Sequence, residues 1–398
     1  MTIVRGVTSS ALSVVGCLAC IACGTVDAFV GPMSAARSSI TRVNNKHVAS
    51  AAYSRAPQGC FTSTSTVGLD NSRARLLRTA AGSSGVSMMA GNAKKTAIIT
   101  GASSGIGLEA AKFLAASGDW HVIMAVRSFA KAEASAKELG MDESSYTVMD
   151  LDLASLNSVR NFVKALKAAK VKPDALVCNA AVWYPKDKEP RRTADGFEEA
   201  VGVNHLGHFL LCNLLLDELK QSRVVFIGTE THNPGSIAGK IPPQAHLGDL
   251  EGLAKNEPMV DGIKYEPTKA YKDSKVCNVL MMREMDKRFA SNGMVVSALF
   301  PGCIAESPLF REKRGWFRTL FPVFQKYITK QFVSTEASAG RRVSEVVSSD
   351  KFTTSGAYWR WNGQDAEATA RENVVSDEAM DDARCEKLWK ISSDLVGI

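Results

Sequence analysis

The sequence predicts an α/β fold, a single domain built on a doubly wound parallel sheet. From Lys94 onward, short apolar segments alternate with longer segments whose apolar residues recur at helical spacing. The first apolar segment runs directly into a glycine-rich turn that opens a helix. Strands separated by helices of this length pair in parallel through right-handed crossovers, which together give a doubly wound sheet.

Each expected strand is a short apolar run, as a strand covered on both faces requires. The strands are expected at residues 96–100, 121–126, 146–150, 175–178, 223–227 and 295–299. The helices are expected at residues 106–117, 130–139, 156–169, 209–219 and 271–289. Residues 232–268 and 305–330 interrupt the alternation after the carboxyl ends of strands. We expect these helical or loop insertions to form a substrate lid.

The composition indicates a globular body with a basic leader. The chain has 398 residues, of which 45% are apolar and 22% charged, and its net charge is +7. Residues 1–90 hold eight Arg or Lys against two acids, whereas the remaining residues hold 40 against 39. A near-neutral body argues against a nucleic-acid partner, which a basic footprint would indicate.

The leader divides into two parts, and the predicted catalytic domain follows at residues 91–398. Residues 1–28 have a short apolar centre and end in small residues, which is typical of a signal peptide. Residues 29–90 begin at Phe29 and are rich in Ser, Thr, Ala and Arg, the composition of a transit peptide. This order resembles the bipartite presequences of algae with complex plastids. The alternative is a secretory signal followed by a Ser-rich linker.

Cysteine usage opposes secretion. Five cysteines follow residue 90, and they form neither a C-x-x-C pair nor a disulfide framework. We therefore expect a reducing compartment and no structural metal. After the leader, no segment has the roughly 18 continuous apolar residues that a membrane-spanning helix needs.

A phosphate-binding turn is predicted where the first strand meets its helix. Glycines there let the backbone approach a pyrophosphate, whose charge is stabilised by the N–H groups at the helix start. The alternative is a glycine loop without a ligand. The spacing GxxxGxG resembles that of the short-chain dehydrogenase/reductase family. The candidate cofactor contacts are Gly101, Ser103, Ser104, Gly105, Ile106 and Gly107.

Cations at the end of the second strand favour NADP over NAD. An acid there would bind the ribose 2′-hydroxyl of NAD, but this chain has Arg127 and, one turn later, Lys131. Ser103 could add a hydroxyl to the same 2′-phosphate. The alternative is that Arg127 and Lys131 are solvated residues at a helix start.

A tyrosine and a lysine lie one turn apart on the last predicted helix. Tyr271 is a candidate proton donor, and the ammonium of Lys275 would stabilise the phenolate that remains. Lys275 could also bind the nicotinamide ribose. Together with Asn204 and Thr229, the pair resembles the catalytic group of short-chain dehydrogenases. That family usually has Ser at the Thr229 position, and Thr231 is the alternative hydroxyl.

Further segments sharpen the resemblance to the light-dependent protochlorophyllide oxidoreductases, over essentially residues 94–398. Several of them are not general features of short-chain dehydrogenases. The matching segments are YKDSKVCN (271–278), FPGCIAE (300–306), LFRE (309–312), LFP (320–322), FQKYITK (324–330), SGAYWRWN (355–362), NHLGHF (204–209) and LGDL (247–250).

The resemblance implies a Rossmann domain that uses NADPH and light. In that family, hydride goes to C17 of protochlorophyllide and a proton goes to C18, and the bound pigment absorbs the light. The resemblance assigns Tyr271 as proton donor or pigment-positioning residue, and Cys303 as the active-site cysteine with a contested role. It also implies that Asp152 and Leu153 reach the adenine. The remaining implied cofactor contacts are Asn179, Ala180, Ala181, Pro301 and Gly302.

The segment at residues 310–327 interleaves six aromatic side chains with basic ones, which suits a flat apolar pigment with carboxylate tails or a lipid surface. Plain core packing is the alternative. The resemblance implies a plastid location, peripheral to the thylakoid or another plastid membrane, and leaves a homo-oligomer open. The rival functions are a dark NADPH-dependent carbonyl or retinol reductase and a non-catalytic NADPH-sensing or membrane-organising protein.

Overall fold

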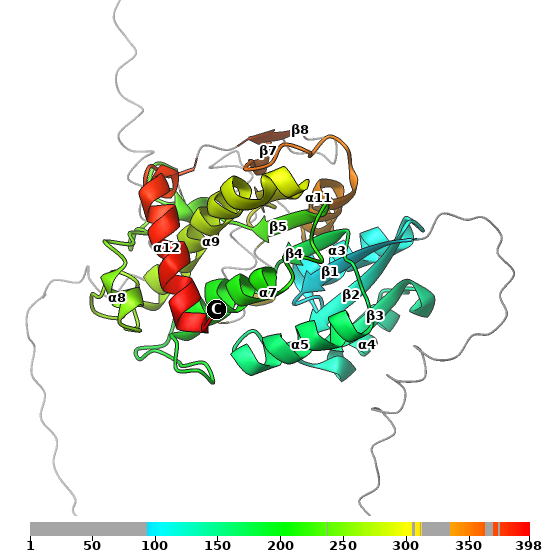
Figure 1. Cartoon of the computed structure of the whole chain (residues 1–398), viewed down its shortest axis with the longest axis horizontal. Coiled ribbons are helices and arrows are strands. Elements are labelled where there is room, and N and C mark those ends of the chain that lie inside the picture. Colours follow the sequence, from blue (N-terminus) through cyan, green and yellow to red (C-terminus); the bar gives the residue numbers. More distant parts are fainter. Residues whose placement is uncertain are drawn as a thin grey trace, which may run out of the picture. The chain divides into compact units, whose positions relative to one another are not determined.

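Residues 94–398 form one eight-stranded sheet covered by helices (Figure 1). The computed structural model describes these residues except 237, 305–306, 311, 313–334, 363–368 and 373–374. The strands are β1 (Lys95–Thr100), β2 (Trp120–Val126), β3 (Tyr146–Asp150), β4 (Ala175–Cys178), β5 (Arg223–Ile227), β6 (Val295–Phe300), β7 (Tyr358–Asn362) and β8 (Thr369–Glu372).

The sheet order confirms the doubly wound fold. The strands run β3-β2-β1-β4-β5-β6-β7-β8, and all neighbours pair in parallel except β7 and β8. The chain therefore crosses from one edge to the middle between β3 and β4. Ligands of such sheets bind at this switch point, outside the carboxyl ends of the strands. The antiparallel β8 departs from the all-parallel expectation.

The helices lie on both faces of the sheet. They are α3 (Gly105–Ala116), α4 (Phe129–Glu138), α5 (Leu156–Ala168), α6 (Glu199–Val201), α7 (Gly207–Leu214), α8 (Glu251–Ala254), α9 (Pro267–Phe289), α11 (Glu336–Ser348) and α12 (Asp382–Val396). A π-helical turn, Gly202–Leu206, joins α6 to α7. Among the helices of the described residues, none has the length and apolar character needed to cross a bilayer.

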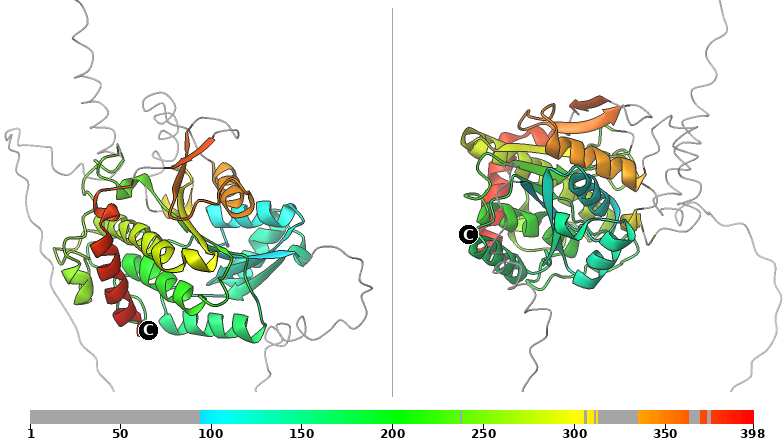
Figure 2. Two further views of the ribbon diagram at one scale, coloured as in Figure 1. Left: turned by 45° about the horizontal axis from the view of Figure 1, so that its top comes forward. Right: turned by 90° about the vertical axis from the view of Figure 1, so that its right-hand side faces the viewer.

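Alternate residues of the strands face opposite layers, as the two-residue period of a strand requires. Ile98 and Leu176 pack with α5, α7, α9 and α12, whereas Ile99 and Val177 pack with α3, α4 and α11. Figure 2 shows α5, α7, α9 and α12 side by side along one face of the sheet. Both faces are buried, which explains the continuous apolar runs of the central strands.

One predicted helix had wrong bounds. The helix expected at residues 209–219 instead starts at Glu199 and reaches Leu214 through the π-helical turn. Its start is capped by Glu198, whose carboxylate accepts a hydrogen bond from Val201 N–H at 2.9 Å. The other predicted helices and strands agree with the structure except for shifts at their ends. The prediction did not include α11, β7, β8 or α12.

The two insertions differ in what the structure describes. Most of residues 305–330 lies outside the described part, so the lid and the aromatic segment predicted there stay predictions. In the first insertion, residues 241–261 are held against α9. Lys272 Nζ donates to the carbonyl oxygens of Ile241 and Pro243, at 2.6 and 2.7 Å.

Candidate active site

The glycine-rich turn lies against the loop that follows β4. Gly101 has a φ of +67°, and a Cβ on Gly107 would lie 2.4 Å from Asn179 Nδ2 and 2.9 Å from the Gly101 carbonyl oxygen. Asn179 Nδ2 donates to the Thr100 carbonyl at 2.8 Å. The turn therefore keeps its shape only if glycine occupies position 107.

The start of α3 suits an anionic ligand. Ser104 is the N-cap residue, its side chain makes no capping hydrogen bond, and the first turn contains no acid. Lys131, on α4, places its Nζ 3.5 Å from Ser104 Oγ, and Arg127 is exposed at the end of β2. Uncapped N–H groups with two nearby cations fit the phosphates of NADPH.

The other predicted cofactor contacts occupy the same edge of the sheet. Ala180 packs on Gly101, and Ala181 follows it on the half-buried loop. Asp152 Oδ1 accepts a hydrogen bond from the N–H of Ala154 at 3.0 Å, so this carboxylate also shapes its own turn. The buried Leu153 packs against α7, because a Cβ on Gly207 would lie 2.6 Å from the Leu153 carbonyl oxygen. The predicted adenine contact of Asp152 and Leu153 stays a prediction.

Tyr271 and Lys275 share one face of α9 and are both buried. Lys275 Nζ lies 5.9 Å from the centroid of the Tyr271 ring, and the Tyr271 ring lies 5.5 Å from that of Trp183. Burial raises the pKa of the Tyr271 hydroxyl above its ordinary value, and the nearby Cys303 raises it further. Burial lowers the pKa of Lys275 to about 8. At neutral pH the phenol keeps its proton and most of the lysine stays charged.

Asn204 positions other elements and is itself fully buried. Its side chain exchanges two hydrogen bonds with the backbone of Val182, at 2.8 and 3.1 Å, and donates to Ser274 Oγ at 3.0 Å. The backbone carbonyl oxygen of Asn204 accepts hydrogen bonds from Asn278 Nδ2 and His208 Nδ1, each at 3.0 Å. Asn204 therefore joins the loop after β4 to α9, the helix that carries Tyr271 and Lys275.

The turn after β5 meets α9 at Lys275. Lys275 Nζ donates to the Ile227 carbonyl at 2.8 Å. Thr229 is half-buried, and its Oγ1 lies 3.1 Å from Thr231 Oγ1 and accepts from the Thr231 N–H at 3.3 Å. Thr229 and Thr231, the two candidates for the hydroxyl that Ser usually provides in this family, therefore contact each other.

The loop after β6 is the last part of the candidate site at this edge of the sheet. Gly302 has a φ of +117°, a conformation that glycine adopts freely, and it separates Pro301 from the half-buried Cys303. Arg342, on α11, donates to the Pro301 carbonyl at 2.7 Å. This contact holds the start of the loop that carries Cys303.

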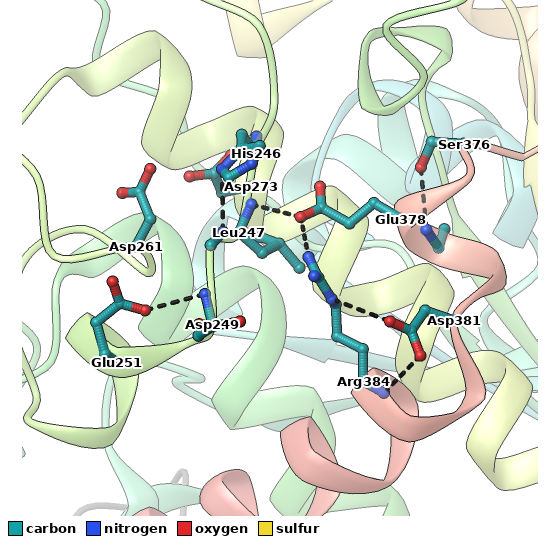
Figure 3. A network of polar contacts seen from close by, with 12 residues as sticks. His246, Leu247, Asp249, Glu251, Asp261, Asp273, Ser376, Glu378, Asp381 and Arg384 are labelled. Carbon is teal, nitrogen blue, oxygen red and sulfur yellow. Dashed lines mark hydrogen bonds and ion pairs between the residues drawn. The ribbon is translucent and has the colours of Figure 1, made fainter.

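A polar network anchors the first insertion to α9 and to the C-terminal segment (Figure 3). Lys269 Nζ forms ion pairs with Asp261 at 2.7 Å and Asp273 at 2.6 Å, and Asp273 Oδ1 accepts from the His246 N–H at 3.0 Å. Leu247 N–H donates to Glu378 at 2.8 Å, and Glu378 also pairs with Arg384. The insertion is therefore tied to the same helix that carries Tyr271 and Lys275.

Sequence reasoning assigned no role to Trp183, Arg342 or Tyr358. Trp183 follows the predicted Asn179–Ala181 contacts by two residues, which was a usable signal. Arg342 and Tyr358 reach the site from the C-terminal part, and only the packing of α11 against α3 and the pairing of β7 with β6 reveal them.

Comparison with known proteins agrees with this geometry. A family model described as short chain dehydrogenase matches residues 95–240. The chain is 55% identical over 315 residues to "Protochlorophyllide reductase, chloroplastic" of Chlamydomonas reinhardtii, covering 77% of this chain and 78% of that protein. It is 51% identical over 317 residues to "Protochlorophyllide reductase A, chloroplastic" of Arabidopsis thaliana, covering 77% of each chain.

A solved short-chain dehydrogenase/reductase of Brucella melitensis shares the fold, with a TM-score of 0.52 and 20% identity over 68% of this chain and 95% of that chain. The short-chain dehydrogenase fold, the Tyr271–Lys275 pair and more than 50% identity to these two relatives lead to one conclusion. The chain belongs to the protochlorophyllide reductase family of the short-chain dehydrogenases.

Proposed function

We propose that this protein catalyses the light-driven, NADPH-dependent reduction of the C17=C18 double bond of protochlorophyllide to give chlorophyllide. The observation that carries the proposal is a convergence at one edge of the sheet. The glycine-rich turn follows β1, the loop of Cys303 follows β6, and Lys275 of the Tyr271–Lys275 pair reaches the end of β5 through the Ile227 carbonyl. The chain that brings them together is 51% and 55% identical to two protochlorophyllide reductases over 77% of its length.

The residues at the start of α3 would hold the cofactor. The N–H groups around Gly105 and Ile106 would bind the pyrophosphate, and Lys131 with Arg127 would bind the 2′-phosphate. When bound, NADPH supplies the hydride that C17 receives. The chain itself provides the orientation of the site and the proton.

Tyr271 is the proposed proton donor to C18. Its raised pKa means that the hydroxyl still holds its proton at neutral pH. When the O–H bond breaks, the proton passes to C18, the electron pair of the broken bond stays on the phenolate oxygen, and the Lys275 ammonium favours that charge. Thr229 lies two residues after Ile227, whose carbonyl Lys275 binds, and Cys303 lies near enough to Tyr271 to raise its pKa, so both would orient the pigment. Asn204 acts indirectly, since it fixes α9 against the loop after β4.

The location and the partners are also part of the proposal. We infer a plastid location, because the relatives named above are called chloroplastic and the leader has the composition of a transit peptide. The aromatic and basic segment at residues 310–327 supports pigment binding and peripheral contact with a plastid membrane. A homo-oligomer is compatible with this arrangement.

A single flash tests the function. Protein, NADPH and protochlorophyllide are mixed in darkness, and absorbance is recorded before and after one flash. We expect a red shift only after the flash and only with NADPH. Conversion of equal extent in darkness would refute the light requirement. Turnover of an aldehyde or retinoid in darkness, without pigment conversion, would favour an ordinary carbonyl reductase instead.

A further inference from the structure

Tyr358 holds the backbone of the turn that carries Thr229. It lies on β7, next to β6 in the sheet, and only 2% of its surface is exposed. Its hydroxyl donates to the Thr229 carbonyl oxygen at 3.1 Å. A buried hydroxyl needs such a partner, and a buried carbonyl oxygen needs a donor. The contact therefore joins the C-terminal part of the chain to the proposed active site.

The turn leaves room for this hydroxyl at Gly228. A Cβ at position 228 would lie 2.3 Å from the Tyr358 hydroxyl oxygen and 2.8 Å from its ring. Real Cβ atoms do not approach this closely, so a larger residue would displace Tyr358. The N–H of Gly228 donates to the Leu299 carbonyl of β6 at 2.7 Å. Glycine at position 228 and tyrosine at position 358 thus fit one another.

Two other side chains hold the same turn. Lys275 binds the Ile227 carbonyl on one side. His232 Nδ1 contacts the Thr229 carbonyl, and because a carbonyl only accepts, Nδ1 carries the proton. The rings of His232 and Tyr358 lie 4.9 Å apart. The backbone of residues 227–229 is therefore fixed from α9, from β7 and from its own loop.

We propose that Tyr358 is a positioning residue of the reaction, which fixes the direction of the Thr229 hydroxyl by holding the Thr229 carbonyl oxygen. The inference rests on the proposed function. Thr229 has only one rotatable bond between its backbone and its hydroxyl oxygen, so the backbone orientation determines where that oxygen lies. Loss of the Tyr358 hydroxyl removes one of the two side-chain donors to the Thr229 carbonyl and loosens the Thr229 peptide. Catalytic turnover then falls while the binding surfaces for pigment and cofactor stay in place.

A double-mutant cycle tests this role. Tyr358→Phe, Thr229→Ala and the double variant are compared with wild type in flash-driven conversion under saturating and limiting pigment. We expect Tyr358→Phe to lower kcat about fivefold, the factor for one ordinary hydrogen bond, with KM unchanged. In the Thr229→Ala background the same change should alter kcat less than about twofold.

Tyr146→Phe is the matched control. Tyr146 is also buried, with 5% of its surface exposed, but its hydroxyl donates to Glu133 at 3.3 Å, away from the site. We expect this variant to keep the wild-type kcat. Melting temperatures of both variants report whether the loss of a buried hydroxyl affects folding alone. If Tyr358→Phe folds poorly, His232→Leu removes the other donor to the same carbonyl and is expected to show the same dependence on Thr229.

The outcomes separate two failures. No light-driven conversion by wild type would overturn the proposed function and this role with it. Conversion by wild type, with Tyr358→Phe changing kcat equally in both backgrounds or not at all, would overturn only the role of Tyr358. A rise in KM with unchanged kcat would likewise show that Tyr358 shapes binding and does not orient Thr229.

Discussion

We expect kcat/KM to fall as the pH rises above about 8, because Lys275 then loses its charge. Its ammonium is buried, which lowers its pKa from 10.5 to about 8. Lysine is charged below its pKa, so the charge that favours the Tyr271 phenolate is lost on the alkaline side. Between about pH 7 and pH 9 the charged fraction falls about tenfold for a group with this pKa. We expect kcat/KM to fall by a similar factor.

The assay is kcat/KM for chlorophyllide formation under constant light, from about pH 6 to pH 10, because this ratio reports groups of the free enzyme. Arginine stays charged over this range, so Lys275→Arg should remove the alkaline fall even if its absolute rate is lower. Lys272→Arg is the matched control. Lys272 lies on the same helix but binds the carbonyls of the insertion. A wild-type profile that stays level to pH 10, or a Lys275→Arg profile that still falls, would refute the reasoning.

Three further predictions concern the cofactor and stability. Lys131→Glu should raise the Kd of NADPH more than about tenfold, because the charge-assisted contact with the 2′-phosphate is lost. NADH lacks this phosphate, so its Kd should stay nearly unchanged. Both Kd values are measured from the fluorescence of the reduced cofactor. Gly107→Ala should also weaken NADPH binding, because its Cβ would displace Asn179 and press on the Gly101 carbonyl. Burial raises the pKa of Glu198 to about 7, so the folded state binds its proton more tightly than the unfolded state does. Its contribution to the free energy of unfolding should therefore fall, by up to about 3 kcal/mol, as the pH rises from about 4.5 to 7. Urea unfolding of Glu198→Gln should lack this slope. An unchanged Kd for either cofactor variant, or parallel slopes for Glu198→Gln and wild type, would contradict the corresponding prediction.

The fold was predictable where local pattern and tertiary burial agree. The central strands are continuous apolar runs, so their bounds came out within about one residue. The helix from Glu199 to Leu214 was not placed correctly, because it carries His205 and His208 with both side chains fully buried. His205 Nε2 lies 2.9 Å from Ser392 Oγ of α12, and such distant partners leave no local signal.

The parts of the candidate site that short sequence motifs define were predictable. The glycine-rich turn and the Tyr271–Lys275 pair each depend on neighbours within about seven residues. The contact of Tyr358 depends on the register of β6 and β7, in which Ala298 is paired with Tyr358. No spacing in the sequence defines that register, because the chain between the two strands is long and includes α11.

The most direct test of the central claim follows the hydride itself. Wild-type protein is loaded in darkness with protochlorophyllide and with NADPH deuterated at the transferable C4 position, given one flash, and the product is analysed by mass spectrometry and NMR. The account predicts one deuterium at C17 of chlorophyllide after the flash and none in the unilluminated sample. Chlorophyllide without deuterium at C17, or labelled product formed equally in darkness, would contradict it.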